Sequence, residues 1–343
     1  MIVTETISAT LSKRLQTEEA VHFTKMCFEQ QLKTHLPLTK VSAPAVVLQG
    51  TGINDDLNGV ERPVAFPIKS MQDQPAEVVQ SLAKWKRLRL REYGLSPGTG
   101  IYTDMKALRP DEDLGKLHSI FVDQWDWEMV LQAEDRHLAF LKLQVEKIYK
   151  AIKETEILLS KKYKGLKPYL PAALTFLHAE ELLERYPHLP AKERENRATK
   201  EFGAVFLIGI GGKLSHGEAH DGRAPDYDDW STPTSSQTKG LNGDILFWNP
   251  VLEQAFEISS MGIRVDPATL KSQLKMCKAE ARAPLFYHQQ LLKGELPQTI
   301  GGGIGQSRLC MFLLKKQHIG EVQAGIWPEQ MRKECEENGI FLL

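Results

Sequence analysis

The sequence lacks several features that would define whole classes of protein. Its formal net charge is −1, and without a basic excess it does not match proteins that bind nucleic-acid phosphates. Its longest apolar stretch, residues 203–212, is too short to cross a membrane and predicts a buried strand. The N-terminus has no continuous apolar segment of the secretory type, and Glu18 and Glu19 weaken a transit-peptide interpretation. We therefore expect neither a nucleic-acid partner nor a membrane.

Cysteine is also scarce. The four cysteines lie far apart, with no CxxC pair: Cys27, Cys277, Cys310 and Cys335. This spacing argues against a disulfide scaffold and predicts reduced thiols in a cytoplasmic protein. The remaining composition is that of an ordinary globular chain, because 42% of its 343 residues are hydrophobic and 25% are charged.

Apolar spacing predicts several helices. Thr17 is a plausible N-cap for the first of them. Alternating steps of three and four between apolar residues make 134–163 a long amphipathic helix. The same reasoning predicts a helix over 81–92, with most of its cations, Lys84 and Arg87 among them, on a solvated face.

Strands are expected at 38–49, 101–109, 118–128, 203–209, 244–248 and 255–265. Pro44 implies an edge or an interruption in the first of these strands. The small, polar stretch 231–243 predicts a loop and a candidate lid.

Two motifs after the strand at 203–209 imitate binding sites. In the stretch GIGGKLS, residues 209–215, Leu214 stands where a phosphate loop needs serine or threonine, and Leu207 before it stands where the loop needs glycine. Leu214 also breaks the dinucleotide fingerprint. His216 and His220 have the spacing of helical metal ligands, but the flanking glycines predict a loop, so we expect no zinc.

The strand at 120–128 carries the most informative pattern. Alternation places Trp125 and Trp127 on one face, which belongs against a core. The opposite face carries an amide and two carboxylates: Gln124, Asp126 and Glu128. A polar face on a central strand lines a pocket, although a solvated outer face is the plainer alternative.

Arg109 ends the preceding strand, before a charged turn that contains proline. An arginine at this point of a hairpin suits a planar anion such as a phosphate or a carboxylate.

Acidic residues follow in two groups, around Asp228 and at Asp244. In a regular strand Ser260 and Arg264 share a face while Glu257 lies on the other. A single site that uses all three therefore predicts a β-bulge near Ser259–Gly262. Carboxylates beside phosphate-binding arginines are typical of Mg²⁺ sites.

The stretch PQTIGGGIGQSRLCMFLL, residues 297–314, combines glycines with Arg308 ahead of an apolar helix. Absent side chains let a main chain press against a ligand, and the start of a helix offers N–H groups to a phosphate. The plainer alternative is a tight turn into a core helix.

Taken together, long strings resemble the ammonia-dependent asparagine synthetase (aspartate–ammonia ligase) family, whose core is similar to class II aminoacyl-tRNA synthetases. The resemblance covers roughly residues 17–328 and rests on these strings: SLAKWKR, MKALRPDED, VDQWDWE, GGKLS, APDYDDWS, GLNGDIL, SSMGIRVD and PQTIGGGIGQSRL.

The resemblance implies an α+β fold with a mainly antiparallel sheet flanked by helices. It implies a single catalytic domain over 1–343, acting as a homodimer. Three regions correspond to the class II motifs: 17–50 to motif 1, the hairpin 101–128 to motif 2, and 299–314 to motif 3.

The family reaction would join L-aspartate to ammonia with ATP and Mg²⁺, through a β-aspartyl-adenylate, and release AMP and pyrophosphate. Catalysis would fall to Arg109, Asp55 and Asp126. The amino acid would be held by Ser81, Lys86, Arg109 and Gln124. The nucleotide region would contain Asp228, Asp244, Glu257, Ser260, Arg264, Gly303 and Arg308, with Asp244 and Glu257 as metal ligands.

Other functions stay open at this point. A class II aminoacyl-tRNA synthetase paralogue would pass the adenylate to RNA. A catalytically silent nucleotide or amino-acid sensor would bind ATP without releasing pyrophosphate. A glutamine-dependent enzyme is a further alternative, but the chain begins Met1–Ile2 and so presents no N-terminal cysteine nucleophile.

Overall fold

The computed structural model describes residues 2–55, 57 and 61–343, and it is built around an eight-stranded sheet. In spatial order the strands are β1 (Leu38–Lys40), β5 (Gly100–Leu108), β6 (Phe121–Val130), β11 (Thr299–Gly305), β10 (Gln254–Ile263), β9 (Asn242–Asn249), β8 (Ala204–Ile208) and β7 (Thr175–His178). The inner pairings, from β5 through β8, are antiparallel. β1 and β7 pair in parallel at the two edges, so the sheet is mixed.

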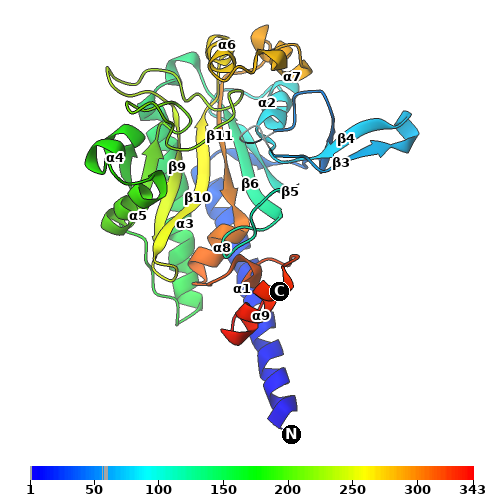
Figure 1. Ribbon diagram of the computed structural model, residues 1–343, viewed down its shortest axis with the longest axis vertical. Helices are drawn as coiled ribbons and strands as arrows, with labels where there is room; N and C mark the ends of the chain where they lie inside the picture. Colours follow the sequence, from blue (N-terminus) through cyan, green and yellow to red (C-terminus); the bar gives the residue numbers. More distant parts are fainter. Residues whose placement is uncertain (1, 56, 58–60) are drawn as a thin grey trace.

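A second, three-stranded sheet contains β2 (Val46–Leu48), β4 (Gln74–Val78) and β3 (Ala65–Ile68). Figure 1 shows β3 and β4 projecting from the body of the molecule. The strand expected over 38–49 is thus two short strands in different sheets, and Pro44 lies in the break between β1 and β2. Proline cannot donate to a strand ladder, which explains the interruption.

One face of the large sheet packs on α1 (Ile2–His35), α3 (Leu138–Lys162) and α8 (Gln306–Leu313). Trp125 and Trp127 of β6 are buried in this core, as the alternation predicted. The helix expected over 134–163 begins after His137, whose Nδ1 accepts a hydrogen bond from the Phe140 N–H at 3.2 Å.

The expected N-cap at Thr17 is wrong. α1 begins at Ile2 and passes through Thr17 without interruption. The Thr17 hydroxyl donates instead to the carbonyl of Lys13 at 3.1 Å, one turn earlier. A hydroxyl residue inside a helix can satisfy itself on the preceding turn, so its presence alone does not mark a start.

The opposite face of the sheet is covered in two parts. α4 (Ala179–Arg185) and α5 (Ala191–Phe202) form a separate apolar cluster with β8. α2 (Ala83–Glu92), α6 (Pro267–Met276) and α7 (Phe286–Leu292) pack together beyond β5 and β6. α9 (Glu329–Glu337) is the last helix, and its Met331 packs against the large core (Figure 1). Short 3₁₀ turns occupy 69–71, 133–135, 280–282 and 319–321.

The solvated cationic face expected on the helix at 81–92 is also wrong for its first turns. Lys84, Lys86 and Arg87 are all buried. Arg87 donates to the carbonyls of Val265 at 2.7 Å and Pro297 at 2.8 Å. A buried charge needs such partners, and those partners are distant in sequence, so local pattern could not reveal them.

The described cysteines are free, and of these only Cys277 is exposed. Within the described residues, no helix has both the length and the apolar character required to span a bilayer. Residues 231–241 of the expected loop 231–243 contain no helix or strand, whereas residues 242 and 243 begin β9.

Candidate active site

A cavity of about 410 Å³, the first cavity, opens on the sheet face opposite the large core. Its floor consists of β6, β10 and β11, and segments around Asp55, Arg109 and Arg223 form its walls. The predicted site residues in its lining are Asp55, Ser81, Arg109, Gln124, Asp126, Asp228, Glu257, Ser260, Arg264, Gly303 and Arg308. Lys86 and Asp244 do not line it; both are buried directly behind residues that do.

The backbone of Arg109 is held in the hairpin, whereas its side chain can still bind a ligand. Its N–H donates to the carbonyl of Ile120 at 2.8 Å, which closes the hairpin between β5 and β6. Among the described residues, its guanidinium has an ion pair with Glu112, with Nη1 4.0 Å from Oε2. The buried Nε has no hydrogen-bond partner among the described residues. A buried donor left without an acceptor favours an anionic ligand at this point.

A β-bulge brings Glu257 to the first cavity. The pairing of β10 with β9 shifts register between Glu257 and Ser259, slightly earlier than the expected interval Ser259–Gly262. The extra residue reverses the alternation, so Glu257 and Ser260 line the same cavity. Arg308, in the first turn of α8, places Nη1 3.2 Å from Glu257 Oε2.

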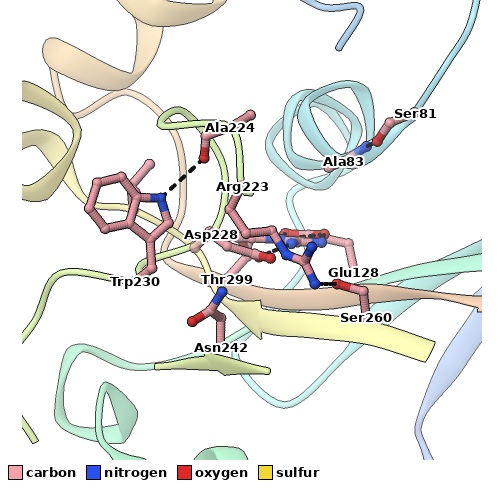
Figure 2. A network of polar contacts seen from close by, with 12 residues as sticks. Ser81, Ala83, Glu128, Arg223, Ala224, Asp228, Trp230, Asn242, Ser260 and Thr299 are labelled. Carbon is pink, nitrogen blue, oxygen red and sulfur yellow. Dashed lines mark hydrogen bonds and ion pairs between the residues drawn. The ribbon is translucent and has the colours of Figure 1, made fainter. Parts of the chain in front are cut away.

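Asp244 lies opposite Ser260 in the pairing of β9 with β10, and Arg223 covers it. The Arg223 guanidinium forms an ion pair with Asp244. It also donates to Ser260 Oγ at 3.0 Å (Figure 2). Burial raises the pKa of Asp244 to about 7; the nearby Glu257 carboxylate adds to the rise, whereas Arg223 opposes it.

The donor set around Asp244 and Glu257 fits Mg²⁺. Within the described residues, no group of three or more acidic, histidine or cysteine side chains could hold a metal ion. Two neighbouring carboxylates are nevertheless the number that Mg²⁺ uses when substrate phosphates complete its coordination. Burial is the main cause of the raised pKa of Asp244, and a bound cation would oppose that rise.

Arg264 is held by two carboxylates on different elements. Glu128 of β6 accepts from Arg264 Nε at 3.0 Å and from Nη2 at 2.8 Å, and it accepts from Thr299 Oγ1 at 2.6 Å. Asp228 forms a second ion pair with the same guanidinium. Figure 2 shows Glu128, Asp228 and Thr299 in this network. Arg264 is therefore fixed in position before any ligand binds.

Lys86 and Asp126 form a buried pair under the first cavity. The Lys86 ammonium contacts Asp126 and donates to the carbonyl of Trp127 at 2.8 Å. Burial raises the pKa of Asp126 even though Lys86 opposes the rise, and burial lowers the pKa of Lys86. Lys86 thus acts on the cavity through Asp126, whereas we expected it to contact the amino acid.

The glycines of β11 also have a role in packing against the neighbouring strand. A Cβ on Gly303 would collide with the side chain of Gln124, and one on Gly301 would collide with Glu128. The space therefore belongs to polar side chains of the neighbouring strand, which lie across β11. The start of α8 is also occupied in part, because Asp123 Oδ1 accepts the Ser307 N–H at 2.9 Å.

Sequence reasoning missed several cavity residues, among them Arg223, Glu112 and His118. Arg223 directly precedes the matched string APDYDDWS, so extending that string by one residue would have found it. Glu112 and His118 lie in the turn after Arg109, where the pattern gives no direction for a side chain. The rejected zinc ligand His220 is buried and contacts Glu195 at 3.0 Å.

The family follows from comparison of the whole chain with known proteins. A model of the family described as aspartate-ammonia ligase matches residues 15–339. The chain belongs to the aspartate–ammonia ligase family. The aspartate–ammonia ligase of Parabacteroides distasonis is 56% identical over 328 residues, which cover 96% of this chain and 95% of that protein. The one from Clostridium perfringens is 54% identical over the same length, with the same coverage.

Solved structures show the same type of fold. The asparaginyl-tRNA synthetase of Pyrococcus horikoshii, solved with asparaginyl-adenylate, matches with a TM-score of 0.66 at 16% identity over 91% of this chain and 70% of its own. The Entamoeba histolytica enzyme, also with asparaginyl-adenylate, matches with a TM-score of 0.65 at 15% identity over 91% of this chain and 66% of its own. The resemblance to class II synthetase catalytic cores is thus confirmed at the level of fold.

Proposed function

We propose that this chain amidates the side-chain carboxylate of L-aspartate with ammonia, using ATP and releasing AMP and pyrophosphate. Family membership over residues 15–339 supports the overall reaction. The main observation in support of nucleotide binding is the position of Arg109. Its side chain lines the first cavity, and its buried Nε has no hydrogen-bond partner among the described residues. Solved fold relatives that carry an aminoacyl-adenylate support an adenylate intermediate.

The first step would activate the carboxylate. An oxygen of the aspartate side chain attacks the α-phosphorus of ATP, and the bond from that phosphorus to pyrophosphate breaks. Negative charge gathers on the α-phosphate, where Arg109 would stabilise it. Arg308 would guide the phosphate tail or pack against the adenine ring. Asp244 and Glu257 would hold Mg²⁺, whose chemistry is to neutralise the charge of the phosphates.

The second step would replace AMP by ammonia. Ammonium must first lose a proton, and Asp55 and Asp126 are buried carboxylates in the lining of the first cavity. The ammonia nitrogen then forms a bond to the acyl carbon, while the bond from that carbon to the AMP oxygen breaks. Loss of one further proton gives asparagine.

Binding of the amino acid would use the polar floor beside these groups. Ser81 and Gln124 line the first cavity, and Arg264, held by Glu128, would belong to the nucleotide region. Asp228 holds Arg264 in place, and Lys86 holds Asp126. Gly303 leaves room for the Gln124 side chain.

We further propose a single catalytic domain that acts as a cytoplasmic homodimer. Exposed apolar residues on α1, Leu15 and Met26, support a partner on this helix. Free cysteines suit a reducing compartment. Light scattering after size exclusion tests the dimer, and a monomer at micromolar concentration would contradict it.

One assay separates the candidate reactions. The protein is supplied with ATP, aspartate and ammonium, and both the nucleotide and the amino-acid products are identified. We expect AMP and asparagine; ADP would indicate an acyl phosphate and reject the adenylate. Charging of tRNA would favour a synthetase, equal use of glutamine would reject ammonia dependence, and ATP binding without pyrophosphate release would indicate a sensor.

A further inference from the structure

A second cavity, of about 310 Å³, borders the first one. Asp55 lines both cavities, so this residue stands between them. The other walls of the second cavity come from residues 48–54, the end of β4 and the start of α7. Asn54 ties the Asp55 segment to β4, because its side chain donates to Glu77 Oε2 at 3.0 Å and accepts the Gln80 N–H at 2.9 Å.

Asp226, in the wall of the second cavity, binds its described neighbours through one oxygen. Its Oδ2 accepts from Lys84 at 3.2 Å and Arg282 at 3.1 Å, and it lies 2.9 Å from His288 Nε2. Its Oδ1 is buried and has no hydrogen-bond partner among the described residues. Burial would raise the pKa of Asp226, but Lys84, His288 and Arg282 hold it well below its ordinary value, so the group is a carboxylate.

Two further acceptors in this lining are buried without a partner among the described residues. One is the side-chain oxygen Oε1 of Gln80. The nitrogen Nε2 of the same amide group donates to the Arg62 carbonyl at 3.3 Å. The other is His288 Nδ1, which presents a lone pair when Nε2 donates to Asp226. Gly52 leaves room for it, since a Cβ at that position would come within 2.8 Å of Nδ1.

The chemistry of these groups selects a small cation that donates hydrogen bonds. Unpartnered buried acceptors require a donor. The lining also has an excess of negative charge, because the carboxylates Asp55, Glu77 and Asp226 outnumber the cations Lys84 and Arg282. Ammonium donates in every direction, accepts nothing and carries one positive charge.

We propose that the second cavity binds ammonium and delivers it past Asp55 to the acyl carbon in the first cavity. This assignment rests on the proposed ligase reaction, in which ATP and aspartate fill the first cavity and leave the nucleophile to arrive from another side. Asp55 takes one proton as ammonium passes, and neutral ammonia continues to the adenylate.

The test compares Gln80→Met, which keeps the side-chain length but removes the acceptor, with Glu77→Gln, which removes a charge. Glu92→Gln is the matched control, because Glu92 lies on the exposed side of α2 and lines neither cavity. We expect the KM for ammonium chloride to rise about tenfold in Gln80→Met and about threefold in Glu77→Gln. The KM values for ATP and aspartate, and aspartate-dependent ATP–pyrophosphate exchange without ammonium, should match the control.

An unchanged KM for ammonium in both variants would overturn the proposal and leave a water-filled cavity. A parallel rise in the KM for aspartate would overturn the assigned occupant. Potassium chloride, a cation of similar size, should compete with ammonium in the unmodified protein; absence of competition would also overturn a cationic occupant. Failure of pyrophosphate exchange in the unmodified protein would instead reject the adenylate reaction, and if Gln80→Met does not fold, Glu77→Gln decides alone.

Discussion

Glu257 and Ser260 line the same cavity although they are three residues apart on one strand. The register shift between Glu257 and Ser259 makes this possible. Asp244 lies directly opposite Ser260 on β9, and side chains of directly opposed residues share a face of a sheet. The bulge therefore brings two carboxylates from neighbouring strands to one point, where burial and their mutual repulsion raise the pKa of Asp244 to about 7.

Asp244→Asn should mainly weaken the dependence on Mg²⁺. Removal of one carboxylate from the pair lowers the affinity for a hard cation, and we expect the Mg²⁺ concentration for half-maximal rate to rise about tenfold or more. Steady-state rates over a magnesium titration at saturating ATP and aspartate measure this value. An unchanged titration would remove Asp244 from the metal site; Asp113→Asn, an exposed carboxylate in the turn after Arg109, is the control.

Much of the fold could be read from local sequence. The alternation in β6 fixed which face carries Trp125 and Trp127, because a strand has only two faces and tryptophan belongs in a core. The interruption between β1 and β2 at Pro44 was predicted because proline has no N–H to donate to a neighbouring strand. The helix start at Thr17 and the exposure of Lys84 were wrong, because a hydroxyl can bond within a helix and a lysine can be buried by a partner as distant as Asp226.

The sequence predicted most of the residues that form the candidate site, but not how their side chains are arranged. The resemblance supplied residues from eight segments, and most of these residues line one cavity. The sequence did not predict which side chains contact one another in the folded protein. Arg223 forms an ion pair with Asp244, and Glu128 lies over Gly301 and binds Arg264. A register shift and a long-range ion pair depend on the neighbouring strand, so a single segment does not encode them.

Arg109→Ala should lower kcat by about 10²-fold or more, the usual scale for losing a donor to developing charge. Thermal stability should change little, since the ion pair of the guanidinium with Glu112, at 4.0 Å, is partly exposed and weak. Turnover and the melting temperature, measured on the same preparation, test both expectations. A loss of turnover below threefold would remove Arg109 from the catalytic role. Arg109→Lys serves as the conservative comparison and should recover only part of the rate, because lysine lacks the planar fork.

Glu128→Gln should destabilise the protein by about 3 kcal/mol, because it removes the charge that pairs with the buried Arg264. Urea denaturation measures the free energy of unfolding. Glu112→Gln is the matched control: its partner Arg109 is partly exposed and 4.0 Å away, so we expect a change below about 0.5 kcal/mol. Equal effects of the two substitutions would show that Glu128 does not organise the floor of the cavity.

The carboxylate of Asp226 should make folding sensitive to acid. Lys84, His288 and Arg282 hold its pKa in the folded protein below the ordinary value of 3.8, even though burial alone would raise it. As the pH falls through that ordinary value, the unfolded chain takes up a proton that the folded chain does not. The stability contributed by Asp226 is therefore fully present above about pH 5 and is lost progressively at lower pH.

Asp226→Asn removes the titrating carboxyl group. The free energy of unfolding of this variant should therefore fall less steeply below pH 5 than that of the unmodified protein. Urea titrations between pH 7 and pH 3 give both curves. The gap between them should be constant above pH 5 and should narrow in acid, because only the unmodified protein loses the contribution of the carboxylate. Parallel curves throughout would mean that Asp226 does not carry a depressed pKa, and would weaken the view that its free oxygen is a charged acceptor in the second cavity.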